Sequence, residues 1–171
     1  MYKEESSRNM ALHHLIEKYQ QKLYWQIRKI VIDHDDADDV MQNTFIKVWK
    51  GLENFKAESQ LFTWLYRIAT NESLTFLRQK QKQNTTSLHP IEYQLSASLE
   101  SDVYFVGDDI QKKLQKAILT LPEKQRIVFN MRYYDEMPYE EMSEVLETSV
   151  GALKASYHIA AKKIEEFLTA D

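Results

Sequence analysis

Three side chains of different chemistry stand at helical spacing in the middle of the chain. Trp64, Arg67 and Asn71 are three and four residues apart, so they form one stripe on a helix that Ser59 is expected to cap. An aromatic ring, a guanidinium and an amide in a row can stack on, pair with and read an unpaired base. A Trp on a helix is also often partly buried, and Trp64 could simply pack against the first helix. The expected buried positions lie on the opposite side: Leu61, Phe62, Leu65, Ile68, Ala69, Phe76 and Leu77.

A second candidate nucleic-acid element lies near the C-terminus. Met142 and Leu146, followed by Leu153 and Tyr157, are spaced to pack two short helices across a tight turn. In the DNA-binding form of this helix-turn-helix motif, the second helix enters the major groove and presents its N-terminal residues to the bases. An ordinary helical corner would show the same pattern. The residues that would face DNA are small and polar with one cation: Ser149, Gly151, Ala152, Lys154, Ala155, Ser156 and His158.

The sequence lacks the signals of catalysis and metal binding. It has no cysteine, its five histidines do not follow an HExxH or other ligand spacing, and it has no glycine-rich phosphate loop or GxSxG motif. The acidic run from Asp33 to Asp39 lacks the spaced ligands and central Gly of a calcium loop, and it suits a helix start better. We therefore expect a protein that is not an enzyme and that uses no cofactor, no metal and no small-molecule substrate.

The fold is predicted to be all-α, because Gly and Pro number only three each and long stretches lack a helix breaker. We expect two small helical domains, 1–83 and 109–171, joined by an acidic linker at 84–108, with the helix-turn-helix in the C-terminal domain. Apolar periodicity predicts helices near residues 10–32, 35–51, 60–83, 109–119, 138–146 and 150–168, and a further helix that begins at the start signal 120–123.

Several local features follow from the same patterns. Asp35 is expected to cap the second helix, and Thr120 with Glu123 has the spacing of a capping box. The second helix has an apolar stripe of Met41, Phe45, Val48, Trp49 and Leu52. The helix after the capping box is expected to point four side chains inward: Ile127, Val128, Met131 and Tyr134.

The distribution of charge matters more than the net charge of −4. Residues 1–86 have a balance of +2, residues 87–109 a balance of −5 without a single Lys or Arg, and residues 110–171 a balance of −1. A weakly charged protein gains little from counterion release, so tight DNA binding by this chain alone is not expected. A partner that supplies the phosphate contacts is implied.

The N-terminus is charged and has no apolar segment of the kind that directs secretion. No apolar run approaches the roughly 20 residues that are needed to span a bilayer. We therefore expect a cytoplasmic protein.

Three motifs resemble the extracytoplasmic-function type of bacterial RNA polymerase sigma factors. The segment DDVMQNTFIKVW (38–49) looks like the family's core-binding helix, and FTWLYRIATN (62–71) is similar to its −10-reading and melting helix. LPEKQR (121–126), followed by YEEMSEVL (139–146), resembles the −35-reading domain. The order of the motifs, their spacing and the two-domain layout all agree with this family. That agreement is far more specific than any one motif alone.

The resemblance implies a transcription initiation factor that binds core RNA polymerase and directs promoter recognition and −10 melting. It implies an acidic linker that threads the polymerase cleft, and an anti-sigma factor, often membrane-anchored, that holds the protein inactive. The residues that would bind polymerase are Asp38, Asp39, Gln42, Asn43, Phe45 and Trp49. Those that would face the −10 element are Lys56, Ser59, Gln60, Thr63, Trp64, Arg67 and Asn71. The −35 element would meet the seven residues from Ser149 to His158 named above.

Two departures from the family pattern lie in the helix-turn-helix. Members commonly have Gly in the turn, where this chain has Glu147, and further arginines along the recognition helix, where it has Ile159 and Ala161. This predicts weaker anchoring at the −35 element. Two other functions remain open on the sequence alone: a stand-alone helix-turn-helix regulator that binds its operator without polymerase, and a helical protein–protein adaptor in which Trp49 and Trp64 are core residues.

Overall fold

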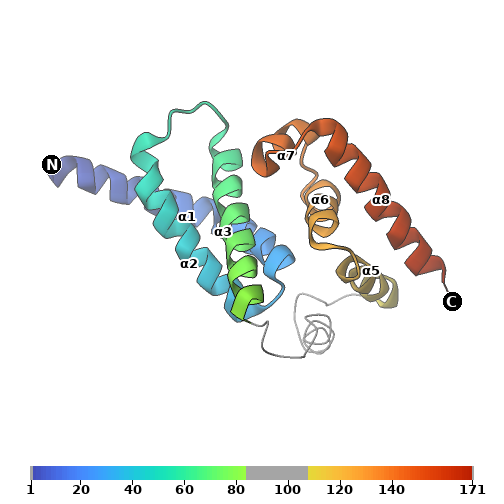
Figure 1. Ribbon diagram of the computed structural model, residues 1–171. Helices are drawn as coiled ribbons and strands as arrows, with labels where there is room; N and C mark the ends of the chain where they lie inside the picture. The colour runs from blue at the N-terminus through green and yellow to red at the C-terminus, as the bar shows by residue number, and fades with distance from the viewer. Residues whose placement is uncertain (1, 84–107, 171) are drawn as a thin grey trace. The chain divides into compact units, whose positions relative to one another are not determined.

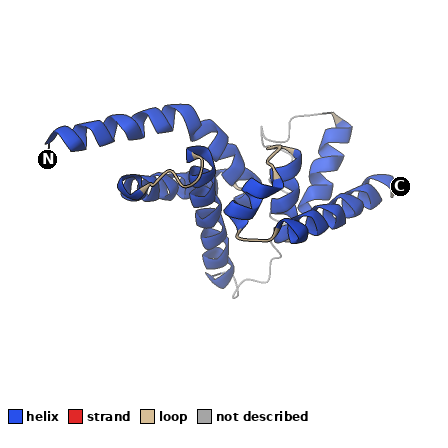
Figure 2. Ribbon diagram, turned by 90° about the horizontal axis from the view of Figure 1, so that it is seen from above, coloured by secondary structure: helices blue, strands red, loops and turns tan. Residues whose placement is uncertain are grey.

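The computed structural model describes residues 2–83 and 108–170, with side chains from Ser6 onward, and every regular element in them is a helix (Figures 1 and 2). The chain divides into two compact units, Met1–Lys80 and Gln81–Asp171. The prediction of an all-α chain with two helical parts is confirmed. The linker prediction concerns residues that, apart from Asp108, lie outside the described ones, and the domain boundaries at 83 and 109 stay a prediction.

The first unit contains α1 (Tyr2–Val31), α2 (His34–Gly51), the short 3-10 helix η1 (Leu52–Asn54) and α3 (Leu61–Gln83). α1 begins at Tyr2 rather than near Met10, because the polar residues between them contain no Gly or Pro that would stop a helix. Figure 2 shows the N-terminal part of α1 extending beyond the other helices of its unit.

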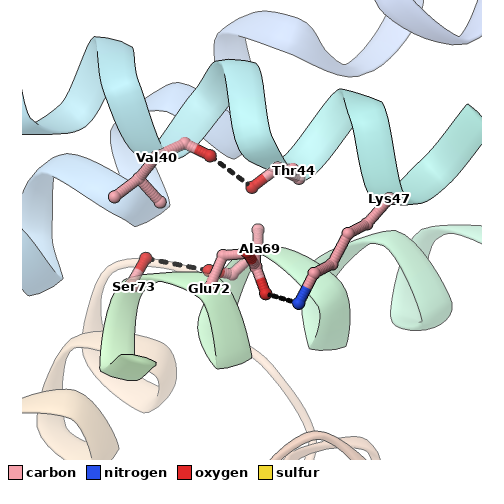
Figure 3. Close-up of polar contacts among 6 residues, drawn as sticks. All are labelled: Val40, Thr44, Lys47, Ala69, Glu72 and Ser73. Carbon is pink, nitrogen blue, oxygen red and sulfur yellow. Dashed lines mark hydrogen bonds and ion pairs between the residues drawn. The ribbon is translucent and has the colours of Figure 1, made fainter. Parts of the chain in front are cut away.

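The core of the first unit contains aliphatic side chains and small hydroxyl-bearing residues together. On α2 the buried face is Ala37, Val40, Thr44 and Val48, so Val48 is the one residue of the predicted stripe that is buried, and the other four are half-buried. Figure 3 shows why hydroxyls can be buried here: Thr44 donates to the Val40 carbonyl at 2.7 Å, and Ser73 donates to the Ala69 carbonyl at 2.8 Å. Each hydroxyl is satisfied on its own helix, so burial leaves no unpaired donor.

Polar contacts join the helices of the first unit across this core. The buried amide of Gln26 on α1 donates to the Tyr66 carbonyl on α3 at 3.1 Å and also contacts the Thr70 hydroxyl. Between α2 and α3, the ammonium of Lys47 pairs with Glu72 (Figure 3). α3 is thus held to both neighbouring helices by side-chain contacts as well as by apolar packing.

The cap of α2 differs from the prediction. The carboxylate of Asp33, not Asp35, accepts the backbone N–H of Asp36 at 3.1 Å. Ile32 has a φ of 72°, and the N–H of Asp33 donates to the Val31 carbonyl at 2.9 Å, so the turn between the helices is very short. The cap is therefore two residues earlier than expected, and Asp35 lies in the first turn of α2.

The second unit contains α5 (Asp109–Leu119), α6 (Glu123–Tyr133), α7 (Tyr139–Leu146) and α8 (Val150–Thr169). The ranges of α5, α7 and α8 match the prediction within one residue, and α6 begins at the predicted start signal. The capping box is wrong, because the hydroxyl of Thr120 donates back to the Ala117 carbonyl at 2.7 Å, at the C-terminus of α5. Pro122 occupies the N-cap position of α6 instead and provides no side-chain bond.

α6 is enclosed by its neighbours almost all round, with every residue from Arg126 to Met131 buried. Tyr134 was expected to point inward but is 43% exposed, because it follows the last turn of α6. Phe129 is buried instead and belongs to a core cluster with residues of α5, of α8 and of the connection between α5 and α6: Ala117, Ile118, Ala160, Ile164 and Leu121. None of the helices in residues 2–83 and 108–170 combines the length and apolar character that a membrane-spanning segment needs.

Candidate functional site

The predicted polymerase-binding residues lie together on the outward side of α2. Their side chains turn away from the buried face of the helix, since the acidic and amide residues are exposed while Phe45 and Trp49 are half-buried. Ile46, which the sequence analysis did not select, lies among them and is 46% exposed. The α2 outer face, as we call it below, consists of Asp38, Asp39, Gln42, Asn43, Phe45 and Trp49. It combines carboxylates, amides and two partly exposed aromatic rings, a composition suited to binding another protein.

Trp49, at the C-terminal end of this face, is held by a residue far away in the sequence. The guanidinium of Arg8 lies over the Trp49 ring, 4.0 Å from the ring centroid. The same group donates to the Trp49 carbonyl and pairs with the carboxylate of Glu53. Sequence patterns did not point to Arg8, because a single arginine in a polar helix gives no periodic signal.

The Trp64 stripe on α3 lies opposite the buried face of that helix. Of the seven residues predicted for that face, Leu65 and Ala69 are buried and the other five are half-buried. Asn71 is exposed, and Trp64 and Arg67 are half-buried. The Trp64 ring packs against Phe55, with ring centroids 5.0 Å apart, and against the Cα of Gly51. The indole is therefore partly buried. It packs against the end of α2 and the segment that follows, not in the core of the unit, and part of its surface stays exposed.

The segment between η1 and α3 contributes exposed polar residues beside Trp64. Lys56 and Gln60 are exposed, and Ser59 is half-buried. α3 begins at Leu61, and the Gln60 carbonyl accepts the Trp64 N–H at 3.0 Å, so the cap position is Gln60 and not Ser59 as expected. Ala57 has a φ of 55°, a left-handed conformation that turns the chain back toward α3.

Thr63 does not belong to the surface set. It is 3% exposed and stands three, seven and ten residues before Tyr66, Thr70 and Ser73, the buried face of α3. Its side chain therefore points into the core in this structure, and we withdraw it from the candidates that face DNA.

The helix-turn-helix is formed by α7 and α8. Its inner contacts come from Met142 and Val145 on α7 and Leu153 on α8, all buried, while Leu146 and Tyr157 flank them half-buried. Every predicted DNA-facing residue from Ser149 to His158 is exposed except Ser156, which is half-buried. The N-terminal half of α8 thus presents these side chains on the surface of the second unit.

Two backbone features shape the turn of this motif. Glu147 ends α7 in the left-handed conformation, with φ 50° and ψ 41°. Ser149 then caps α8, and its hydroxyl accepts the Ala152 N–H at 3.3 Å. Because Ser149 has this capping role, its hydroxyl is engaged at the helix start, and a DNA contact would have to share it.

Two cations gather around an aromatic ring beside the recognition helix. The Tyr139 ring has the Arg132 guanidinium 5.1 Å and the Lys154 ammonium 5.6 Å from its centroid. Arg132 also donates to the Met137 carbonyl at 3.2 Å. Arg132 and Tyr139 were not selected from the sequence, because their relation to Lys154 depends on how α6, α7 and α8 pack.

One further basic group in this unit is internal. Burial lowers the pKa of the Arg126 guanidinium, and the nearby charge of Glu123 opposes the shift. Within residues 6–83 and 108–170, no three acidic or histidine side chains gather closely enough to hold a metal ion.

Comparisons with known proteins match both units. Residues 15–83 match the family described as Sigma-70 region 2, and residues 111–164 match Sigma-70, region 4. The RNA polymerase sigma-H factor of Pseudomonas aeruginosa is 29% identical over 162 residues, covering 90% of this chain and 84% of that protein. The ECF RNA polymerase sigma factor SigW of Bacillus subtilis is 27% identical over 156 residues, covering 86% and 83%.

Solved structures support the fold. The sigma factor RpoE of Bartonella quintana, in complex with the anti-sigma factor NepR, matches with a TM-score of 0.73 and 21% identity over 93% of this chain and 97% of that one. CnrH, in complex with the cytosolic domain of CnrY, matches with a TM-score of 0.69 and 24% identity over 95% and 90%. At these identities the likeness shows a shared fold.

Proposed function

The chain belongs to the extracytoplasmic-function type of the sigma-70 family of sigma factors, and we propose that its two units divide promoter recognition unequally between them. As a sigma factor it is a transcription initiation factor that binds RNA polymerase and directs it to promoters. In the proposal, the first unit binds core polymerase and opens the −10 element, and the second unit anchors the −35 element.

The α2 outer face would dock on core polymerase. The observation that carries this assignment is that all six residues lie on one side of α2, opposite Ala37, Val40, Thr44 and Val48. A helix whose inward side is fully occupied by its own core can offer the other side to a partner without unfolding. The exposed carboxylates Asp38 and Asp39 would also select a basic partner surface.

The Trp64 stripe would capture a base from the non-template strand of the −10 element. Lys56 and Gln60, with Ser59 beside them, stand next to the stripe and would hold the displaced strand. Stacking an extruded base on an aromatic ring and bonding its edge with an amide offsets the cost of unstacking, so recognition and melting are coupled. Trp64 is braced on one side by Phe55, and we assign base stacking to the surface that this contact leaves open.

The N-terminal part of α8 would enter the −35 major groove. Its candidate residues are Ser149, Gly151, Ala152, Lys154, Ala155, Ser156 and His158, of which Lys154 is the one cation. A single cation supports few phosphate contacts, so this unit would bind weakly and depend on polymerase to place it.

The remaining parts of the proposal follow from family membership. Both solved relatives are described in complexes, RpoE with the anti-sigma factor NepR and CnrH with a domain of CnrY. We propose that an anti-sigma factor, often membrane-anchored in this family, covers the faces that bind polymerase and DNA. The chain would act in the cytoplasm, where RNA polymerase transcribes, and would itself catalyse no reaction.

Binding and transcription assays together test this proposal. The purified chain is titrated with core RNA polymerase, and run-off transcription is measured on duplex and on pre-melted promoter DNA. We expect polymerase binding, transcription from both templates, and no specific duplex binding by the free chain. A chain that binds a duplex operator without polymerase would be a stand-alone regulator. A chain that binds neither polymerase nor DNA would be a helical adaptor.

A further inference from the structure

The N-terminal end of α1 is fixed to α2 although it lies outside the family match, which begins at residue 15. Its anchor is Arg8, which contacts the last turn of α2 and η1. We propose that Arg8 is a positioning residue for polymerase binding: it holds the Trp49 ring in the orientation in which the α2 outer face docks. This inference rests on the proposed function of that face.

Three contacts made by one planar group carry the proposal. The Arg8 guanidinium lies 4.0 Å from the centroid of the Trp49 ring, donates to the Trp49 carbonyl, and pairs with Glu53. The Arg8 side chain is only 22% exposed, whereas that of Glu53 is 65% exposed. A planar fork of donors can stack on an indole and bond an oxygen at its edge at the same time, which a lysine ammonium cannot do.

The position of the contact explains what it does for Trp49. The Trp49 carbonyl is one of the last four carbonyls of α2, which ends at Gly51. The last four carbonyls of a helix accept no hydrogen bond from a backbone N–H of the same helix. A cation at this place also opposes the negative end of the helix dipole. Arg8 therefore stabilises the end of α2 and restricts the Trp49 side chain in one step.

A ring that is already oriented loses less conformational freedom when a partner binds it. Trp49 is half-buried, with one face under Arg8, so the exposed part of the ring is presented in a defined direction. The general effect of such preorganisation is tighter binding without new contacts. It follows that Arg8, which precedes the family match, contributes to polymerase binding through Trp49 without itself belonging to the α2 outer face.

The first test compares Arg8→Ala and Arg8→Lys with a control on the same helix, His13→Ala, whose side chain is 70% exposed. Affinity for core polymerase is measured by titration with full-length protein. We expect Arg8→Ala to weaken binding between about 3-fold and 10-fold, the range of a cation–aromatic contact. Arg8→Lys keeps a cation over the ring but loses the planar set of donors. Its affinity for polymerase should therefore lie between those of the wild type and Arg8→Ala. His13→Ala should bind as the wild type does.

A spectroscopic readout separates positioning from simple stabilisation. With 5-fluorotryptophan in the protein, the Trp49 resonance is assigned from Trp49→Phe. The Trp49 resonance should shift or broaden in Arg8→Ala, while the Trp64 resonance stays in place. The spectra are compared at a temperature where circular dichroism shows that the variant is still folded. An unmoved Trp49 resonance would overturn the proposal. So would tighter polymerase binding by Arg8→Ala, because Arg8 would then mask the ring instead of presenting it.

Trp49→Ala distinguishes failure of this inference from failure of the proposed function. If Trp49→Ala leaves polymerase affinity unchanged, the assignment of the α2 outer face is wrong. If Trp49→Ala weakens binding and Arg8→Ala does not, only the role of Arg8 is wrong. When both are right, Arg8→Ala added to Trp49→Ala should cause no further loss, because Arg8 acts through the ring.

Discussion

The indole ring of Trp64 lies directly on Gly51. A Cβ atom placed on Gly51 would meet Cζ2 of Trp64 at 3.0 Å and Cη2 at 3.5 Å. The backbone of Gly51, with φ −87° and ψ −16°, is one that any residue can adopt. Glycine therefore matters here for space and not for conformation, and it lets the end of α2 support the ring proposed to capture a base.

Increasing the side chain at Gly51 should impair promoter opening in proportion to its size. Gly51→Ala requires the Trp64 ring to move by a few tenths of an ångström, and Gly51→Val requires a larger displacement. We expect a small and then a large loss of run-off transcription on duplex promoter, with much less loss on pre-melted DNA. Lys50→Val, a β-branched substitution at the preceding exposed position, controls for the effect on the helix. Equal losses on both templates would contradict the role of Gly51 in opening.

Replacing Glu147 with glycine should stabilise the second unit. Glu147 has a φ of 50°, which is unfavourable for a residue with a Cβ and free for glycine. The relief is partly offset by the greater freedom of glycine in the unfolded chain, so we expect a net gain of about 0.5–1 kcal/mol in the free energy of unfolding. Chemical denaturation of the full-length chain measures it.

Glu144→Gly is the matched control for this gain. Glu144 is exposed within α7, where glycine should cost about 1 kcal/mol. The two substitutions remove the same kind of side chain, one within α7 and one at its C-cap, so opposite signs would identify the backbone conformation as the cause. A loss of stability in both would show that Glu147 contributes something other than strain.

Replacing Gln26 with glutamate should destabilise the first unit at neutral pH. The amide of Gln26 is 2% exposed and donates to the Tyr66 carbonyl, a contact that a carboxylate cannot make. We expect a loss of about 2–3 kcal/mol, because a buried charge or an unsatisfied acceptor replaces a hydrogen bond. Burial raises the pKa of such a carboxyl above its unfolded value, so part of the loss should be recovered as the pH is lowered. Gln26→Met, of similar volume, should lose less and should not depend on pH.

Adding a guanidinium to the recognition helix should strengthen −35 binding. Ile159 is 46% exposed and lies three and seven residues beyond Ser156 and Ala152, on the same side of α8. With polymerase holoenzyme on duplex promoter DNA, we expect Ile159→Arg to bind about 3- to 10-fold more tightly and to steepen the dependence of log affinity on log salt by about 0.9 for one added phosphate contact. Ile159→Gln removes the apolar group without adding charge and should leave the salt dependence unchanged. If Ile159→Arg leaves it unchanged too, this side of α8 does not face DNA.

The elements of the fold could be predicted because their signals are local. The ranges of α5, α7 and α8 follow from apolar periodicity within each helix. The outward direction of Trp64, Arg67 and Asn71 follows from the 3.6-residue repeat of a single helix. Neither inference requires knowledge of what the helix packs against.

Details that depend on neighbouring elements could not be predicted in the same way. Thr63 looked like a surface residue and is buried, because α3 turns a face containing Thr63, Thr70 and Ser73 toward the core. Asp33 replaced Asp35 as the cap because the turn at Ile32 proved shorter than the charge pattern suggested. In both cases several residues were chemically suitable for the role, and the packing of the folded chain determines which of them takes it.

The sequence by itself determined an all-α chain, most of its helix ranges, and the outward direction of Trp64, Arg67 and Asn71 on α3, since these depend on repeats of three and four residues within one helix. Only the tertiary structure decided what supports those residues. Arg8 reaches Trp49 across 41 positions, and Trp64 rests on Gly51 and Phe55. Such contacts join residues distant in sequence through the shape of the folded chain, and no pattern along the sequence records them.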